Sequence, residues 1–92
     1  MKPDPEELSQ RFARGFPGAG IEIVDDSQRH AGHAGAAGGA GHYRVRIVSD
    51  RFQGLSTVAR HRLVYDSVTD WMPHRIHALN IEARTPEEAR AA

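Results

Sequence analysis

The sequence of 92 residues contains no cysteine and a single lysine, and its acidic and basic residues balance at twelve each. Without cysteine the chain can form no disulfide, no thiolate metal site and no thiol nucleophile. A metal ligand must therefore be an imidazole or a carboxylate, or a partner must supply the sulfur. The balanced charge gives no overall basic footprint for nucleic acid or an anionic membrane, so any basic patch must come from local arrangement.

Long apolar runs are also absent. No stretch approaches the length of a membrane span, and the start, MKPDPEEL, is too polar for a secretory signal. We therefore expect a cytoplasmic chain that does not associate with membranes. Its length fits one small domain over residues 1–92 with a single modest core and frayed ends at 1–3 and 90–92.

Capping signals predict three helices. The first covers residues 5–15 with Asp4 as its N-cap, the second covers residues 57–72 with Ser56 as its N-cap, and a short third helix begins after Thr85. The apolar face of the second helix is expected to hold Val58, Val64, Tyr65, Val68, Trp71 and Met72.

Alternation of apolar and polar residues predicts strands at 21–26, 42–48 and 75–83. The first two form an antiparallel hairpin, and its connection, residues 27–41, is expected to be a long mobile loop. The order α-β-β-α-β(-α) favours an α+β fold, a three-stranded mixed sheet with helices on one face. Along the last strand, His77 is expected to share the apolar face with Leu79, Ile81 and Ala83.

The histidines have different expected roles. His61 lies on the apolar face of the long helix and is most simply a packed, hydrogen-bonded core residue, while His74 is expected in an exposed turn. His77 lies near the start of the last strand, where a ligand role stays open. His30 and His33 could chelate a metal ion, but two imidazoles in a Gly/Ala run lack the ligands and second shell of a specific site.

The sequence gives no support for an enzyme. Asp25 and Asp26 are adjacent at a strand end and would point to opposite faces, no Ser/His/acid arrangement is indicated, and no glycine loop has P-loop spacing.

Several separated motifs recur from Val48 onward. The segments VSDRFQGLSTVARHRLVYDSV and RIHALNIEARTPEE closely resemble the BolA family, whose signature joins a Phe-x-Gly turn, an Arg-His-Arg helix and an Ile/Val-His-Ala-Leu strand. The resemblance extends back to IEIVDDS and covers about residues 20–88. It implies a class II KH-like fold with a short helical turn at the Phe-x-Gly segment and a terminal helix.

The resemblance also implies a function. BolA-like proteins pair with monothiol glutaredoxins in handling [2Fe-2S] clusters and in iron regulation, and some are DNA-binding transcription regulators. In the shared cluster the glutaredoxin and its glutathione supply sulfur, while the BolA-like partner supplies a strand histidine and a second ligand from the first hairpin loop.

Carried over to this sequence, the strand histidine is His77. The loop ligand is His30, His33 or His42; His30 is preferred because it follows the DDS strand end, and His42 is second. Imidazole can replace thiolate on one iron, as in Rieske centres, and protonation near about pH 6 should labilise such a cluster. The isolated chain is expected to hold no cluster and to be a monomer or weak homodimer.

The alternative is a DNA-binding regulator. Its candidate residues are Arg44, Arg46, Arg51, Arg60 and Arg62. The first two share the outer face of the sheet with Glu22 and Glu82, so cross-strand ion pairs would explain them without DNA. The net charge of zero also argues for weak non-specific affinity. We therefore rank this function second.

Overall fold

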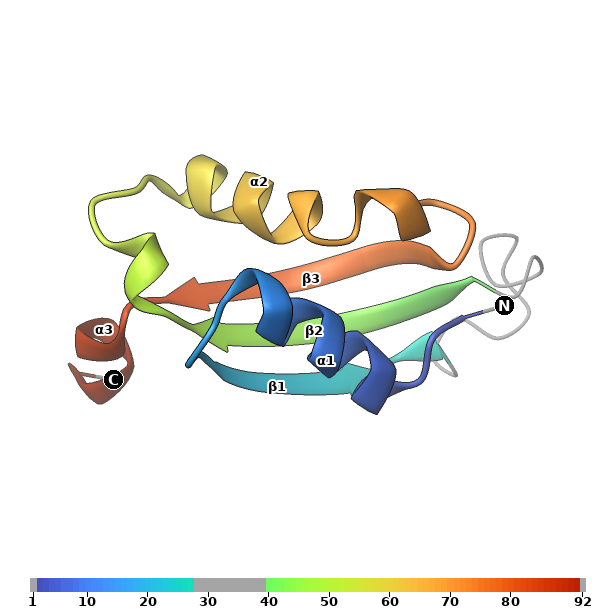
Figure 1. The fold of residues 1–92 in the computed structure, drawn as a ribbon, viewed down its shortest axis with the longest axis horizontal. Coiled ribbons are helices and arrows are strands. Elements are labelled where there is room, and N and C mark those ends of the chain that lie inside the picture. The colour runs from blue at the N-terminus through green and yellow to red at the C-terminus, as the bar shows by residue number, and fades with distance from the viewer. Residues whose placement is uncertain (1, 28–39, 92) are drawn as a thin grey trace.

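The computed structural model describes residues 2–27 and 40–91. The helical elements are α1 (Pro5–Gly15), α2 (Thr57–Asp66) and α3 (Pro86–Ala91), with two 3-10 turns, η3 (Asp50–Phe52) and η4 (Thr69–Trp71). The strands are β1 (Gly20–Asp25), β2 (Gly41–Val48) and β3 (Ile76–Arg84). They form one sheet in the order β1-β2-β3, antiparallel between β1 and β2 and parallel between β2 and β3 (Figure 1). The predicted three-stranded mixed sheet is confirmed.

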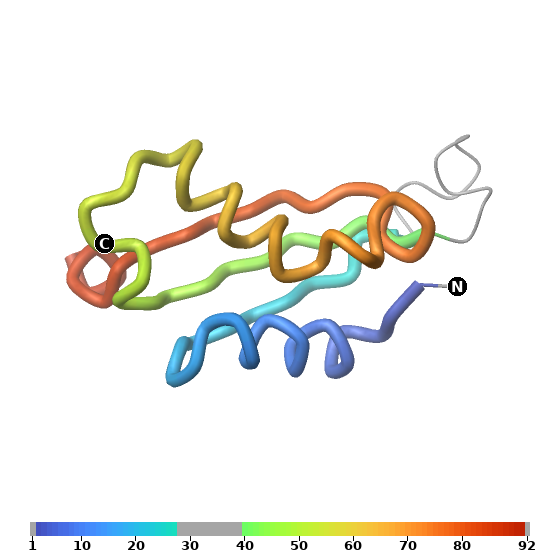
Figure 2. Tube along the Cα trace, turned by 45° about the horizontal axis from the view of Figure 1, so that its top comes forward, coloured from blue at the N-terminus to red at the C-terminus, as the bar shows by residue number. Residues whose placement is uncertain are grey.

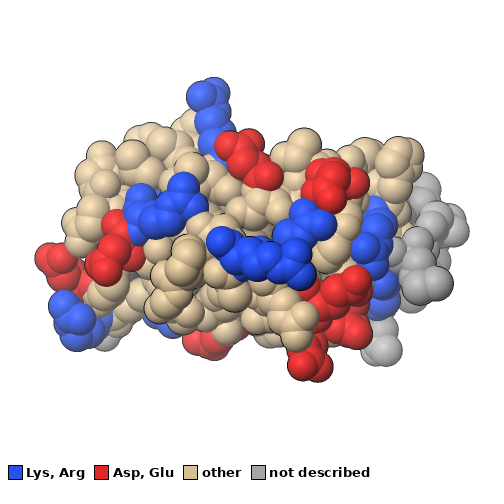
Figure 3. Space-filling model, in the orientation of Figure 1, with Lys and Arg blue, Asp and Glu red and all other residues tan. Residues whose placement is uncertain are grey.

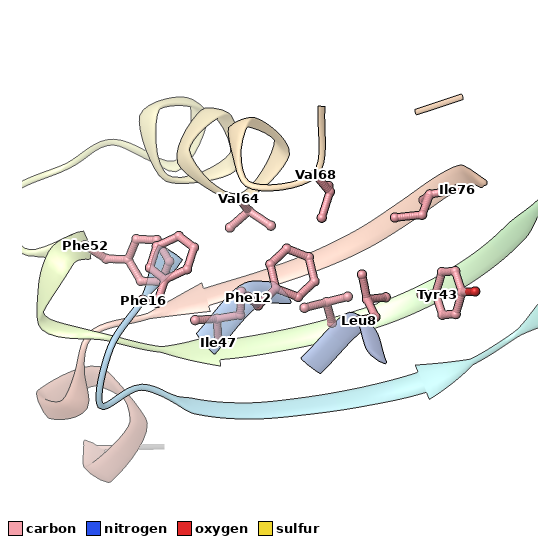
Figure 4. Close-up of a cluster of buried hydrophobic side chains, with 10 residues drawn as sticks. Leu8, Phe12, Phe16, Tyr43, Ile47, Phe52, Val64, Val68 and Ile76 are labelled. Atoms are coloured by element: carbon pink, nitrogen blue, oxygen red, sulfur yellow. The ribbon is translucent and has the colours of Figure 1, made fainter. Parts of the chain in front are cut away.

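Helices α1 and α2 cover the same face of this sheet, as the two views show (Figures 1 and 2). Side chains from both helices and from β2 fill the space between the layers (Figure 4). The buried cluster consists of Leu8, Phe12, Phe16, Tyr43, Val45, Ile47, Phe52, Val64, Val68 and Ile76. The predicted arrangement, with helices on one face of an α+β sheet, is confirmed.

The predicted caps are present. The Asp4 carboxylate accepts from the Glu7 amide at 2.8 Å and so begins α1 at the expected residue. At α3 the Thr85 amide donates to Glu88 at 2.8 Å, and the Glu88 amide donates to the Thr85 hydroxyl at 3.2 Å, which is a reciprocal capping box.

The second helix is shorter than predicted. It ends at Asp66 rather than running to residue 72, and η4 follows as a separate turn. The Thr69 hydroxyl donates to the Tyr65 carbonyl at 3.1 Å, the acceptor that a continuing helix would offer to the Thr69 amide. This local competition interrupts a segment whose apolar pattern alone favours a longer helix.

The apolar face of this segment also differs from the prediction. Val64 and Val68 are buried as expected, whereas Val58 is 63% exposed and Tyr65 is 37% exposed. Leu63 packs against the core in their place. Trp71 and Met72, also predicted for this face, pack against the core. The predicted stripe is therefore correct from Val68 onward and wrong at Val58 and Tyr65.

The N-terminal residues are held more firmly than expected. Lys2 forms an ion pair with Asp25 at 2.8 Å, Pro3 is buried, and the Tyr43 hydroxyl donates to the Pro3 carbonyl. The fraying expected for residues 1–3 therefore does not apply to Lys2 and Pro3. Most of the predicted 27–41 loop, residues 28–39, lies outside the described residues. Over the part of the chain that is described, no helix has both the length and the apolar character to span a membrane.

Candidate functional site

Two of the four candidate ligand histidines fall within the described structure. His77 is the second residue of β3 and His42 is the second residue of β2, while His30 and His33 lie outside the described residues. Parallel neighbouring strands start at the same end of a sheet, as β2 and β3 do here (Figure 1). The topology therefore brings His42 and His77 together although they are far apart in sequence.

The two imidazole rings are in contact. Their centres are 4.8 Å apart and their planes are tilted by 47°. His77 is exposed and His42 is half-buried, with its Nε2 atom covered. Use of that nitrogen by a ligand would require the neighbouring side chains to rearrange, whereas His77 can be approached directly.

A register shift determines where His77 points. Gly41 pairs with Ile76, but His42 pairs with Ala78, so His77 is the extra residue of a β-bulge. Ile76 is buried and His77 is exposed. The prediction that His77 shares the apolar face of the strand is therefore wrong. Simple alternation cannot reveal a bulge, which inserts one residue and re-aims the side chain at that point.

Gly41, just before His42, has no room for a side chain. A β-carbon at this position would overlap the Tyr43 ring. The Gly41 amide donates to the Arg75 carbonyl at 3.0 Å and so joins the first residue of β2 to the residue just before β3. The glycine is thus required by the close approach of the Tyr43 ring to the first residue of β2.

His42 is also fixed from the β1 side. Its amide donates to the Ser27 hydroxyl at 3.1 Å, and its carbonyl accepts from the Asp26 amide at 2.7 Å. The Ser27 amide in turn donates to the Asp25 carboxylate at 2.8 Å. Burial alone would raise the pKa of Asp25, but the hydrogen bonds from Lys2 and Ser27 outweigh it and lower the pKa. Sequence reasoning did not find this anchor, although an Asp-x-Ser turn is a visible signal for it.

A shallow pocket of about 200 Å³ adjoins His42. Its lining residues are Asp26, His42, Tyr43, Ala78, Leu79 and Asn80. The Asp26 carboxylate there is bound by Arg44 at 2.8 Å. The described residues contain no group of three or more histidine, aspartate or glutamate side chains that could hold a metal ion. The histidine pair can thus provide only part of a metal's coordination sphere.

The comparisons with known proteins decide the family. The family model described as BolA-like protein matches residues 13–88. The chain belongs to the BolA family.

Three relatives of this BolA-family chain illustrate the match. SufE-like protein 1, chloroplastic/mitochondrial, of Arabidopsis thaliana is 51% identical over 73 residues, which cover 74% of this chain and 20% of that protein. The DNA-binding transcriptional regulator BolA of Escherichia coli is 32% identical over 83 residues, which cover 90% of this chain and 76% of that protein. The solved structure of the BolA domain of Arabidopsis thaliana SufE1 superposes with a TM-score of 0.80 at 38% identity. The match covers 96% of this chain and 98% of that domain. This chain therefore spans one fifth of the length of the SufE-like relative.

The remaining motif histidines of this BolA-family chain lie away from the pair. His61 is half-buried and borders an open hollow of about 420 Å³ beside Arg60 and Glu88. The expectation of a packed core residue is therefore wrong, because His61 lies half-buried at the rim of this hollow and outside the buried cluster. His74 lies exposed in a turn, as expected.

The arginines proposed for DNA binding are mostly engaged in ion pairs. Arg46 binds Glu22 at 3.3 Å and Glu82 at 3.0 Å, as predicted for the outer sheet face. Arg60 binds both oxygens of Glu88, at 2.6 and 3.2 Å.

The other three arginines proposed for DNA binding do not form a basic patch with Arg46 and Arg60. Arg44 binds Asp26, Arg51 donates to the Gly15 carbonyl next to η3, and Arg62 is exposed on α2. The five arginines thus come from three separate elements. On the helical face, basic and acidic side chains are interspersed (Figure 3).

Proposed function

We propose that this chain is a non-enzymatic BolA-family adaptor that completes a [2Fe-2S] cluster with a monothiol glutaredoxin in cluster assembly, trafficking and iron regulation. The observation that carries the proposal is the contact of His42 with His77, at 4.8 Å between ring centres. Two imidazoles that bind one tetrahedral ion through bonds of about 2.0 to 2.1 Å have ring centres about 5 Å apart. The spacing of the pair suits ligation of a single iron.

The supply of ligands supports a shared site. The sequence has no cysteine, and the described residues offer no set of three metal-binding side chains. Iron in a [2Fe-2S] cluster needs sulfur, which a thiol-bearing partner such as a glutaredoxin provides. Imidazole in place of thiolate raises the reduction potential, as it does in Rieske centres. The chain would thus modify a cluster that its partner brings.

The structure changes which histidine we propose as the second ligand of the cluster. Because His42 already contacts His77, we propose it ahead of His30, the residue favoured by its position after the DDS strand end. Ser27, which binds the His42 amide, is three residues before His30. Three residues span at most about 11 Å, so His30 stays within that distance of Ser27, and His30 and His33 remain the alternatives.

Reconstitution tests this assignment. The [2Fe-2S] cluster is assembled anaerobically with a monothiol glutaredoxin and the chain, and visible absorption and circular dichroism are compared across His77→Ala, His42→Ala and His30→Ala. His74→Ala, an exposed turn residue, is the matched control. We expect His77→Ala and His42→Ala to lose the spectrum of the mixed complex and the control to retain it.

Each outcome has one reading. An unchanged spectrum in His77→Ala would exclude the proposed adaptor site. A change in His30→Ala with none in His42→Ala would move the second ligand to His30.

DNA binding ranks second. The Escherichia coli relative is named as a DNA-binding transcriptional regulator, which is the observation in its favour. Against it, Arg44, Arg46 and Arg60 are already bound to carboxylates, and contact with phosphate would have to displace those pairs.

A further inference from the structure

Trp71 contacts two arginine side chains near the start of β3. The guanidinium carbon of Arg11 is 4.1 Å from the centre of the Trp71 ring, and that of Arg75 is 4.4 Å from it. Cations at this distance are attracted to the face of an indole ring, and planar guanidinium groups also stack on it. A carboxylate binds each cation: Asp70 binds Arg11, and Glu7 binds Arg75.

These five residues, which we call the arginine-tryptophan cluster, connect three elements. Glu7 and Arg11 belong to α1, Asp70 and Trp71 belong to η4, and Arg75 immediately precedes β3. The pair of Arg11 with Asp70 is the closer one, with hydrogen bonds of 2.6 and 3.0 Å, whereas both hydrogen bonds of Arg75 to Glu7 are 3.3 Å long. The cluster therefore ties the first helix to the entry of the last strand.

Arg75 is held at both its backbone and its side chain. Its amide donates to the Trp71 carbonyl at 2.8 Å, and its carbonyl accepts from Gly41 at 3.0 Å. The side chain lies against the same Trp71 ring. Arg75 is two residues before His77, so its position fixes where β3 begins relative to β2.

The hydrogen bond from the Gly41 amide to the Arg75 carbonyl matters because the β-bulge follows directly after it. A strand pair is prone to change register where its side chains specify it weakly, and a change of one residue turns each side chain to the other face. Here the bulge leaves Ile76 buried and His77 on the outside, against His42. The bulge must therefore be fixed from the side of the preceding turn.

We propose that Trp71, bound by Arg11 and Arg75, is a positioning residue that fixes the bulge and so sets His77 against His42. The functional part of this inference rests on the proposed cluster-binding role of the pair. Its structural part concerns the chain alone.

The test measures the contact of the two rings in the isolated full chain, with neither iron nor partner. Nuclear Overhauser cross-peaks between the ring protons of His42 and His77 are recorded for the unmodified chain and for Trp71→Leu, which keeps an apolar side chain but removes the indole face. We expect the cross-peaks to be lost in Trp71→Leu while the rest of the amide spectrum stays dispersed.

Arg51→Met is the matched control. It removes another arginine stacked on an aromatic ring, Phe16, at 5.0 Å. Phe16 lies at the opposite end of the core from Ile76 (Figure 4). The control should retain the cross-peaks. If Trp71→Leu does not fold, the test uses Arg75→Met instead, which removes only the cation next to β3. This variant is also expected to lose the cross-peaks between His42 and His77.

Cross-peaks of full intensity in a folded Trp71→Leu or Arg75→Met variant would overturn the proposal. Failure of the proposed function gives a different result. In that case the cross-peaks would still be lost in Trp71→Leu, but the spectrum of the cluster would not change in His77→Ala. If both inferences hold, Trp71→Leu also weakens the spectrum of the complex with the glutaredoxin, although it removes no ligand.

Discussion

At the scale of single residues, the Phe-x-Gly turn depends on Gly54. Its φ of 73° lies in the left-handed region, which costs a residue with a β-carbon about 1–2 kcal/mol. We expect Gly54→Ala to lower the free energy of unfolding by about that amount, measured by urea denaturation. Gly20→Ala is the control, because Gly20 lies in a regular strand and an added β-carbon would make ordinary contact with Val48. Equal effects of the two substitutions would refute the backbone explanation.

Individual residues also mark the limit of sequence reasoning. The pairing of Arg46 with glutamates on both neighbouring strands followed from alternation and was correctly predicted. The exposure of His77 could not be predicted in this way, because the bulge depends on the register between two strands that are distant in sequence. The contact of His42 with His77 likewise needs the parallel pairing to be known residue by residue.

At the scale of elements, capping motifs were the most informative signals. The bounds of α1 and the start of α3 follow from local hydrogen bonds that the sequence displays directly. The end of α2 was missed, because the Thr69 hydroxyl competes for a carbonyl that an apolar pattern does not reveal. Local chemistry thus predicted both bounds of α1 and the start of α3, but not the end of α2.

The capping box of α3 makes a prediction about pH. Hydrogen bonds from Arg60, and then from the Thr85 amide, lower the pKa of Glu88 from 4.5 to about 2. Its charged form therefore stabilises the folded chain above pH 4.5, and this contribution is lost as the pH falls through about 2. We expect Glu88→Gln to be less stable than the unmodified chain at neutral pH.

The difference between the two chains should close between pH 4.5 and about pH 2. Urea midpoints measured across this range check it. A difference that stays constant with pH would mean that Glu88 acts through its shape and not its charge.

At the scale of the whole molecule, the charges balance by local pairing. The net charge is zero, and the arginines of the outer sheet face bind carboxylates of that same face. Counterion release then contributes little to DNA binding, and affinity that rests on few phosphate contacts depends weakly on salt. We expect no salt-sensitive binding of duplex DNA in the micromolar range. Isotherms at two salt concentrations measure this, and a steep loss of affinity with salt would favour the regulator function.

The fold was predictable as a whole because its period-two and capping signals agree with one another. The candidate site was predictable only in part. The family resemblance pointed to His77 and ranked His42 second among the loop ligands, but the contact between these two rings emerged only from the pairing of two parallel strands. In the proposed shared site the sulfur ligands would come from another protein, so one sequence alone would show only part of it.

The most direct measurement is pulsed electron paramagnetic resonance of the reduced cluster, formed with unlabelled glutaredoxin and with this chain carrying 15N-histidine. Direct ligation of iron by the chain gives strong 15N couplings from two histidines, and His77→Ala, which is expected to lose the mixed complex, should show none. A reduced cluster with no 15N coupling from the chain would contradict the proposal that its histidines bind iron.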